Sequence, residues 1–335
     1  MFLVGRALYA FAAVALVLLL STLITLRPTP VASILHQLTP GSANETLRYA
    51  YATFLSTRVE DDQADDPYFT ATRTLAYQLL QQPSTRTRLD VPFLVLVPPH
   101  VPRSKRRALV REGATVVPVD LLEPDDNWLS PGEERWIDQF AKLNLFNMTE
   151  YDRILYMDND MLLTRPLDAI WDEAIVRQVQ QTGTDKRRVR PDEAPLPATY
   201  QIVGVSDTGG GDHPFPPEES DGLNGGFFML RPDARLFSYY RSIMAIPGRF
   251  DSAFMEQALL NYAHRRDGNM PWRAFEMGKW NCNWPNRQDL EGGAATLHDK
   301  FWSDGNRDWI DRKLVEMWWR VQGAMEGYWR AKNEN

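Results

Sequence analysis

The stretch Tyr151–Asp168, YDRILYMDNDMLLTRPLD, decides the fold that we expect for this chain. Within it, Ile154–Met157 is a short continuous apolar run, which is typical of a strand covered on both faces. The run leads directly into two carboxylates, Asp158 and Asp160, separated by one residue. Because side chains two apart on a strand point the same way, we expect both carboxylates to face one small volume at the end of the strand.

The carboxylate pair allows two interpretations. Carboxylates at the edge of a core repel each other and lose hydration, so they need a compensating charge. A divalent cation would supply it, and a cation that also holds phosphate oxygens makes a nucleotide site. The alternative is an acidic turn that caps a helix beginning near Asp168, and spacing alone does not decide between the two.

Composition limits the class of protein. The chain has 335 residues and a formal net charge of -7. This charge does not indicate a nucleic-acid-binding protein, which usually carries an excess of basic residues. Eleven tryptophans and 44% apolar residues indicate a substantial folded core. Cys282 is the only cysteine, so no intrachain disulfide can form. We therefore expect a core held by burial rather than by cross-links.

The N-terminal segment Ala7–Leu26 has no charged residue, and it is long enough to cross a bilayer, which takes about 20 residues. A cleavable signal peptide usually has a shorter apolar region, although Val31-Ala32-Ser33 could serve as a cleavage site. We expect an uncleaved transmembrane helix with the body of the chain in the lumen. The triplets at Asn44 and Asn147 would then be glycosylation acceptors.

The chain divides into four parts. We predict a short tail and transmembrane anchor over 1–27, and a stem rich in Pro, Ser and Thr over 28–47. The folded domain follows over 48–310. A helix over 311–335, with apolar residues at helical spacing, is expected to pack on it.

Strand and helix patterns alternate along the folded domain. Strands are predicted at 48–56, 93–97, 115–119, 154–157, 201–206 and 226–230, and helices at 68–82, 103–112 and 250–264. This alternation predicts an α/β fold with a mainly parallel sheet covered by helices on both faces. In such sheets ligands bind beyond the carboxyl ends of the strands, where the two aspartates lie.

Two helix starts have sequence signals of their own. Asp66-Pro67 combines a capping aspartate with a proline that fits the first turn. The segment Ser130–Glu133 has capping-box spacing and predicts a helix that carries Trp136, Phe140 and Lys142.

Two further segments interrupt the alternation. The polar segment 173–197, with the basic cluster Lys186–Arg190, predicts a flexible insertion with a solvated basic face. The Gly, Pro and acidic loop Asp207–Gly222 is long enough to form a functional lid or wall.

Several blocks in a fixed order resemble the glycogenin-like glycosyltransferases of family 8, and most of all their fungal membrane-anchored members. The blocks lie between Tyr49 and Trp302 and read YATFLS, DPYFTATRTLAYQLL, FAKLNLFNMTEYDRILYMDND, VGVSD, NGGFFMLRP, EQALLNYA and LHDKFW. The resemblance implies a GT-A type, Rossmann-like nucleotide-diphospho-sugar transferase fold. It also implies retaining transfer from a UDP-sugar.

The resemblance implies roles for individual residues. Eight residues match family positions that hold the uracil, ribose, diphosphate or sugar of the donor. They are Ala52, Thr53, Tyr68, Lys142, Asn159, Asn224, Gly225 and Lys300. Asp158, Asp160 and His298 match the metal ligands, and this mixed oxygen and nitrogen set suits Mn²⁺, with Mg²⁺ as the alternative. Gln257, Glu256 and Asp207 are the candidates for catalysis near the anomeric carbon.

The chain departs from the family pattern at two places. Glu256 stands before Gln257 where the family usually has aspartate, and only one residue separates His298 from Lys300. These departures support an alternative function, a catalytically inactive protein that binds a nucleotide or a partner. A phosphatase using Asp158 as nucleophile is disfavoured, because three predicted strands precede that residue.

The leading hypothesis is a Golgi or endoplasmic reticulum enzyme, single-pass and type II, that transfers a hexosyl group. Retention requires either a protein nucleophile or same-face attack assisted by the leaving phosphate, and both remain open. We expect UDP-glucose or UDP-galactose as donor, because the predicted site shows no apolar recess for an acetyl group. The acceptor is an unknown glycan, protein or lipid.

Overall fold

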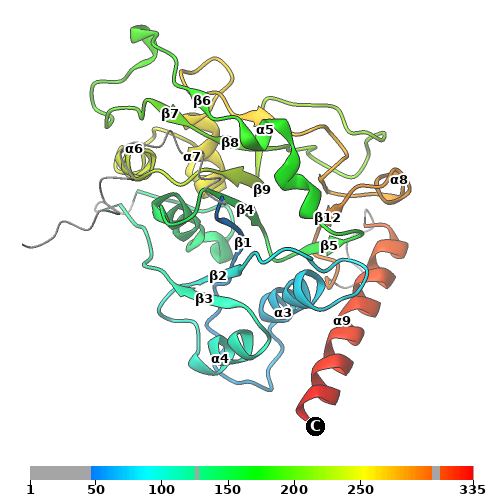
Figure 1. Cartoon of the computed structure of the whole chain (residues 1–335). Helices are drawn as coiled ribbons and strands as arrows, with labels where there is room; N and C mark the ends of the chain where they lie inside the picture. The colour runs from blue at the N-terminus through cyan, green and yellow to red at the C-terminus, as the bar shows by residue number, and fades with distance from the viewer. Residues whose placement is uncertain (1–46, 125–127, 304–309, 335) are drawn as a thin grey trace, which may run out of the picture. The chain divides into compact units, whose positions relative to one another are not determined.

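The computed structural model describes residues 47–124, 128–303 and 310–334 (Figure 1). The predicted transmembrane segment, the stem and Asn44 lie outside these ranges. Within the described ranges, no helix combines the length and the apolar character needed to span a membrane.

A seven-stranded sheet forms the centre of the fold (Figure 1). Its strands, in spatial order, are β10 (Arg273–Ala274), β8 (Ile202–Ser206), β9 (Leu223–Leu230), β4 (Arg153–Met157), β1 (Tyr49–Phe54), β2 (Phe93–Val97) and β3 (Thr115–Pro118). β9 runs antiparallel to both of its neighbours, and all other neighbouring pairs are parallel. The predicted mainly parallel sheet is therefore confirmed.

Alternate side chains of β1 enter two different cores, which explains why the strand has no polar face. Ala50 and Ala52 belong to a buried cluster shared with α6 and α7, whereas Tyr51 belongs to a cluster shared with α3 and α4. The α-helices are α3 (Pro67–Leu80), α4 (Arg103–Arg111), α5 (Ala174–Arg177), α6 (Ala234–Met244), α7 (Met255–Ala263), α8 (Arg287–Glu291) and α9 (Arg312–Asn333). Burial on both faces is the arrangement that the apolar strand sequences predicted.

The helix signals at Asp66 and Asp311 act as caps. The Asp66 side chain accepts a hydrogen bond from the backbone of Phe69 at the start of α3. Asp311 does the same for Lys313 at the start of α9. α9 lies along α3 (Figure 1) and buries Trp318 completely.

A small three-stranded sheet brings the C-terminal part of the folded domain next to the end of β4. It consists of β11 (Asn281–Asn283), β12 (Thr296–His298) and β5 (Met161–Leu163), and β12 runs antiparallel to β5. In this register His298 pairs with Met161, the residue after Asp160. The pairing brings the histidine to the carboxylates across more than a hundred residues of sequence.

The predicted helix over the 130s is wrong. The segment forms two 3₁₀ helices, η1 (Glu134–Trp136) and η2 (Gln139–Asn147). Ser130 does not cap either of them, because its backbone N–H donates to the Ser252 side chain. Gly132 likewise donates to the carbonyl of Ala253, so pairing with the 252–253 loop replaces the capping box.

Other boundaries also differ from the predictions. β9 begins at Leu223 rather than at Gly226, and α7 begins at Met255 after the short 3₁₀ helix η5 (Ser252–Phe254). The segment predicted as a flexible insertion contains secondary structure: α5, η4 (Lys186–Arg188) and β6 (Gln180–Gln181), which pairs with β7 (Thr199–Tyr200). The remaining 3₁₀ helix is η3 (Asp168–Asp172).

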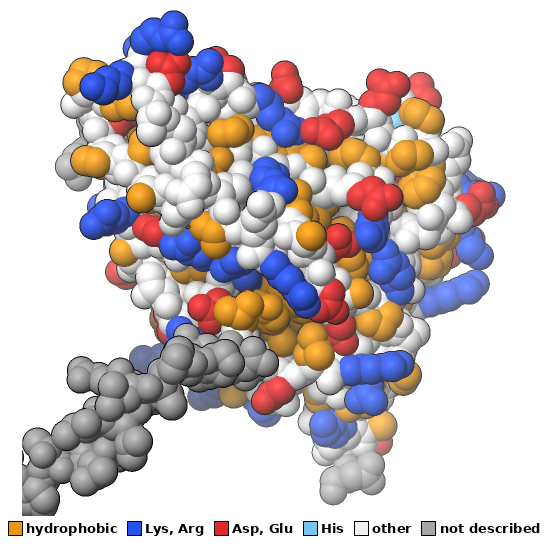
Figure 2. Space-filling model, turned by 45° about the horizontal axis from the view of Figure 1, so that its top comes forward, with side chains coloured by type: hydrophobic (Ala, Val, Ile, Leu, Met, Phe, Trp, Pro, Cys, Tyr) orange, Lys and Arg blue, Asp and Glu red, His pale blue; other side chains and the backbone are white. Residues whose placement is uncertain are grey.

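The surface drawn in Figure 2 carries charges of both signs. Basic and acidic side chains lie next to one another across this face, with hydrophobic side chains between them. Its charge is therefore mixed rather than of one sign.

Candidate active site

A cavity of about 700 Å³ lies at the carboxyl ends of β1 and β4. Loops from both halves of the chain form its walls, as expected for a parallel sheet. Of the predicted site residues, those that line it are Tyr68, Lys142, Asp158, Asn159, Asp160, Asp207, Asn224, Gly225, Glu256, Gln257, His298 and Lys300.

The structure does not bring Ala52 and Thr53 to the cavity. Both lie inside β1 and are fully buried, because the strand is covered on each face. The cavity reaches the chain at Phe54 and in the loop that follows, at Ser56 and Arg58. The predicted contact of these two strand residues with uracil and ribose stays a prediction, since neither of them lines the cavity.

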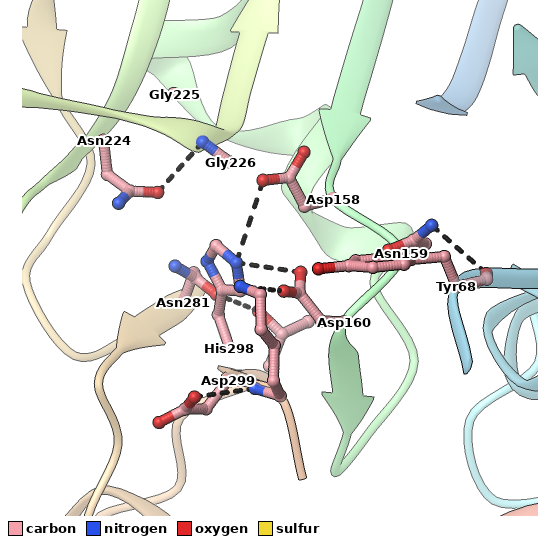
Figure 3. Close-up of polar contacts among 12 residues, drawn as sticks. Tyr68, Asp158, Asn159, Asp160, Asn224, Gly225, Gly226, Asn281, His298 and Asp299 are labelled. Atoms are coloured by element: carbon pink, nitrogen blue, oxygen red, sulfur yellow. Dashed lines mark hydrogen bonds and ion pairs between the residues drawn. The ribbon is translucent and has the colours of Figure 1, made fainter. Parts of the chain in front are cut away.

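Asp158, Asp160 and His298 form the cluster shown in Figure 3, in which one ligand atom of each lies within 4.8 Å of the others. His298 Nε2 is 3.0 Å from Asp160 Oδ1 and 3.9 Å from Asp158 Oδ2. Asp158 is fixed through its backbone, since its N–H donates to the Gly226 carbonyl at 2.8 Å. The three side chains thus converge from the end of β4, the β4–β5 connection and β12.

The donor set and its surroundings fit a divalent metal ion. Two carboxylates and one imidazole are ligands that Mn²⁺ accepts. A Cβ added at Gly226 would lie 2.3 Å from His298 Cε1 and 2.8 Å from Asp158 Oδ2. Only glycine therefore allows β9 to approach the cluster so closely.

The electrostatics keep Asp160 in its ionised form. Burial raises its pKa, but the charges of Lys300 and His298 more than offset this, so the pKa lies well below its usual range. The pKa of His298 is lowered by burial but raised further by Asp160 and Asp158, and lies above its ordinary value.

Each carboxylate of the pair also contacts a lysine. Lys300 Nζ lies 3.0 Å from Asp160 Oδ2, so the short spacing after His298 still brings this cation into the cavity. Lys142 Nζ lies 2.9 Å from Asp158 Oδ1. Two ammonium groups beside the cluster are suited to the oxygens of a diphosphate.

Glu256 lines the cavity, but its carboxylate is paired with Lys142. Only 5% of Glu256 is exposed, and its Oε1 is 2.8 Å from Lys142 Nζ. Burial raises the pKa of Glu256 above its ordinary value, although Lys142 counteracts this. The predicted catalytic carboxylate is thus held in a buried ion pair.

Asp207, Asn224 and Gln257 form a hydrogen-bonded wall of the cavity. Asp207 Oδ2 accepts from Gln257 Nε2 at 3.3 Å and from Asn224 Nδ2 at 3.4 Å. Gln257 Oε1 accepts from the backbone of Gly225 at 2.8 Å, which fixes α7 against β9. These groups offer oriented donors and acceptors to sugar hydroxyls.

Asn159 lies at the cavity but directs its amide into the protein. Its Nδ2 donates to Thr72 Oγ1 at 3.1 Å and to the Tyr68 carbonyl at 3.3 Å (Figure 3). The residue therefore joins the loop after β4 to α3. It positions Tyr68, which lines the cavity with its ring against Trp302.

Sequence reasoning missed a polar group next to the cavity. Arg58 donates to Asp138 at 2.8 and 3.1 Å, and Ser56 donates to the same carboxylate at 2.5 Å. Aromatic residues Trp136, Phe254 and Trp284 also line the cavity. Trp136 and Phe254 lie in the short helices η1 and η5, and no pattern in the sequence pointed to a place at the cavity for these aromatic residues.

Comparisons with known proteins give relatives of two kinds. No protein-family model matches the chain. Two uncharacterised proteins of Schizosaccharomyces pombe are 28% and 27% identical, over 82% of this chain and 78% and 79% of their own lengths. Galactinol synthase 3 of Arabidopsis thaliana is 26% identical over 87 residues, 26% of either chain.

Solved structures of glycosyltransferases resemble the chain more distantly. A galactosyltransferase in complex with donor and acceptor sugar analogues is 16% identical with a TM-score of 0.46, over 82% of this chain and 95% of that chain. Mouse xyloside xylosyltransferase 1 is 13% identical with a TM-score of 0.46, over 79% of this chain and all of that chain. Similarity at this level carries no functional conclusion. The sequence similarity to the galactinol synthases covers about a quarter of this chain.

Proposed function

We propose that this protein is a retaining, metal-dependent glycosyltransferase of GT-A type that transfers a hexosyl group from a UDP-sugar. One observation carries the proposal. Asp158, Asp160 and His298 converge within 4.8 Å at the edge of a mainly parallel sheet, and Lys142 and Lys300 contact the two carboxylates. Such a site combines a place for a divalent cation with groups that bind a diphosphate.

The metal site follows from the chemistry of its donors. Asp158, Asp160 and His298 would hold Mn²⁺, or Mg²⁺ in its place, and a bound ion supplies Lewis-acid stabilisation to the departing diphosphate. Lys300, beside Asp160, would add positive charge to the same oxygens. Lys142, fixed between Asp158 and Glu256, would do so from the other side.

The donor sugar would lie against Asp207, Asn224 and Gln257, where the transition state develops positive charge. Asp207 Oδ2 accepts hydrogen bonds from both of the other side chains, so that oxygen is already engaged. This favours same-face attack assisted by the leaving phosphate over a covalent intermediate on Asp207. Glu256 is engaged with Lys142, so its role is to position that lysine.

The choice of substrates belongs to the same proposal. The wall formed by Asp207, Asn224 and Gln257 consists of polar groups that match sugar hydroxyls, which supports UDP-glucose or UDP-galactose as donor. Ser56 and Arg58, in the loop after β1, would contact the nucleoside. The acceptor is a glycan, protein or lipid whose identity the proposal leaves to experiment.

Titration calorimetry of UDP with and without Mn²⁺ tests the site. Asp160→Asn should abolish the Mn²⁺-dependent part of UDP affinity, because it removes one ligand charge. Asp212→Asn, an exposed carboxylate outside the cavity lining, is the matched control and should bind as the wild type does. Unchanged Mn²⁺-dependent affinity in Asp160→Asn would refute the metal site.

Catalysis needs a separate assay, because the alternative function is a nucleotide-binding protein without activity. A panel of UDP-sugars should show Mn²⁺-dependent hydrolysis, fastest with UDP-glucose or UDP-galactose. Mn²⁺-dependent UDP binding without hydrolysis of any donor would favour the inactive alternative. A preference for UDP-N-acetylglucosamine would overturn the choice of donor but keep the reaction class.

The location in a Golgi or endoplasmic reticulum membrane is also proposed, with residues 7–26 as the anchor and the catalytic domain in the lumen. Glycosidase treatment should then increase the electrophoretic mobility of the protein, and Asn44→Gln should remove this shift. Digestion of the catalytic domain by protease added to intact microsomes would refute the luminal orientation.

A further inference from the structure

A second cavity, of about 680 Å³, lies between α3, α4 and α9. α4 contributes Ser104, Arg107, Ala108 and Arg111, which share one face of the helix because they are three, four and seven residues apart. Figure 1 shows α3 between α4 and the C-terminal half of α9. We refer to this cavity as the α4–α9 groove.

The groove is basic in a protein whose net charge is negative. Its lining contains five basic and two acidic side chains, which gives a formal charge of +3, whereas the whole chain carries -7. The acidic groups are engaged with groups of the groove: Glu112 accepts from Arg73 at 2.8 Å, and Asp62 accepts from Ser104 at 2.8 Å. The groove therefore offers an excess of positive charge.

Three of the cations have no carboxylate partner. Arg73 is paired with Glu112, and buried Lys105 lies 3.1 Å from Asp66. In contrast, within the described ranges no carboxylate lies at ion-pair distance from the groove residues Arg107, Arg111 and Lys332. All three side chains are exposed, so they are free to bind an anion that enters the groove.

A buried donor in the groove also lacks an acceptor. Trp329 is 6% exposed, and its Nε1 donates to no acceptor among the described residues. Lys332 lies over the same indole, with Nζ 5.1 Å from the ring centroid. Because Nε1 itself is buried, Trp329 contributes its ring rather than its N–H to the groove, and the ring supports the ammonium of Lys332.

From these contacts we propose that the α4–α9 groove binds a small molecule that carries a phosphate group. Arg107 and Arg111 have planar guanidinium groups, each of which can donate two parallel hydrogen bonds to the oxygens of one phosphate. Lys332 adds a third positive charge. The volume of the groove matches a ligand of small-molecule size.

The groove is distinct from the candidate active site, although the two are neighbours. Lys105, which lines the groove, contacts Asp66, and Asp66 lines the other cavity. Asp66 also accepts from Thr57 at 2.7 Å. One buried ion pair thus lies between the two sites, and a phosphate in the groove needs no metal ion.

The test uses inorganic pyrophosphate as the probe, with the full-length protein in EDTA so that the metal cluster does not contribute. Calorimetry should show saturable binding to the wild type. Arg107→Ala/Arg111→Ala should weaken it by about tenfold or more, because two charge-assisted contacts are lost. The matched control Arg103→Ala/Arg320→Ala removes two exposed charges from α4 and α9 outside the groove lining, and it should bind like the wild type.

Further arms identify the source of the phosphate and exclude the active site. Lys300→Met, which lacks one ammonium of the candidate active site, should bind pyrophosphate in EDTA as tightly as the wild type does. Sedimentation with phosphatidic acid vesicles distinguishes a lipid headgroup, which would pull down the wild type but not Arg107→Ala/Arg111→Ala, from a soluble ligand, which would leave both in solution. Equal thermal unfolding of the two double variants would show that both remain folded.

Two results would overturn the proposal. The first is absence of saturable pyrophosphate binding to the wild type. The second is an equal loss of affinity in the groove variant and in the matched control, which would show that general charge rather than the groove attracts the anion.

Discussion

The buried ion pair between Lys142 and Glu256 gives a quantitative prediction for the candidate active site. The two residues are 4% and 5% exposed, and the ammonium also contacts Asp158, which is partly exposed. Removing one member of a buried pair costs about 3–5 kcal/mol, because the other charge is left in a poor environment. The cost therefore depends on what remains around each partner.

The structure ranks the single variants. Glu256→Leu leaves Lys142 with Asp158 at 2.9 Å, so we expect a loss of about 3 kcal/mol in the free energy of unfolding. Lys142→Met leaves two carboxylates without their shared cation, one of them buried, so we expect about 5 kcal/mol.

The double variant is the sharper measurement. In the Lys142→Met background, Glu256→Leu removes a buried charge that has no partner, so it should be neutral or stabilising there although it destabilises the wild type. The coupling between the two positions should be about 3 kcal/mol or more. Urea unfolding of the four proteins gives this value, and Glu316→Leu on the exposed face of α9 is a control that should change stability by about 0.5 kcal/mol or less. If Glu256→Leu costs the same in both backgrounds, Glu256 does not position Lys142 and our reasoning is wrong.

Three further predictions concern the metal cluster and the core. Gly226→Ala should weaken Mn²⁺ binding by about 10–100-fold in calorimetry, because its Cβ would lie 2.3 Å from the imidazole of the cluster, whereas Gly210→Ala, with nothing within 4 Å, should not. Burial lowers the pKa of His264 to about 4, below the ordinary value of 6.5. The neutral imidazole therefore contributes its full stability above pH 6.5, and this contribution is lost as the pH falls through 4. Urea unfolding at pH 7 and at lower pH should show this loss, about 3 kcal/mol in total, and His264→Gln should lack it. Trp318→Ala should cost about 3–5 kcal/mol in the same assay, because the side chain is fully buried, and Trp319→Ala, which is half exposed, should cost far less; equal costs would contradict the packing of α9.

The sequence predicted the local features that depend on neighbouring residues. The apolar run before Asp158 became β4, and Asp66-Pro67 became the start of α3 with the aspartate as its cap. These signals are reliable because side-chain alternation and capping act over a few residues. The same locality explains why the mainly parallel sheet could be predicted from the alternation of strands and helices.

Local signals failed where distant parts of the chain compete for the same groups. Ser130 has the spacing of a capping box, but its backbone bonds to the 252–253 loop instead, and two 3₁₀ helices result. α6 was not predicted, although Asp233 caps it through two hydrogen bonds to its first turn. Ala52 and Thr53 lie inside β1 and are fully buried, whereas the cavity is lined by the end of the strand and the loop that follows it.

The sequence by itself determined that two carboxylates follow a buried strand, and its resemblance to a known family singled out His298, Lys142 and Lys300 as their companions. Only the tertiary structure decided how these residues meet. His298 reaches Asp160 because β12 pairs antiparallel with β5, and Lys142 reaches Asp158 from a 3₁₀ helix that no local pattern predicted. The physical reason is that strand pairing and core packing join segments far apart in the chain, whereas periodicity and capping report only on neighbours.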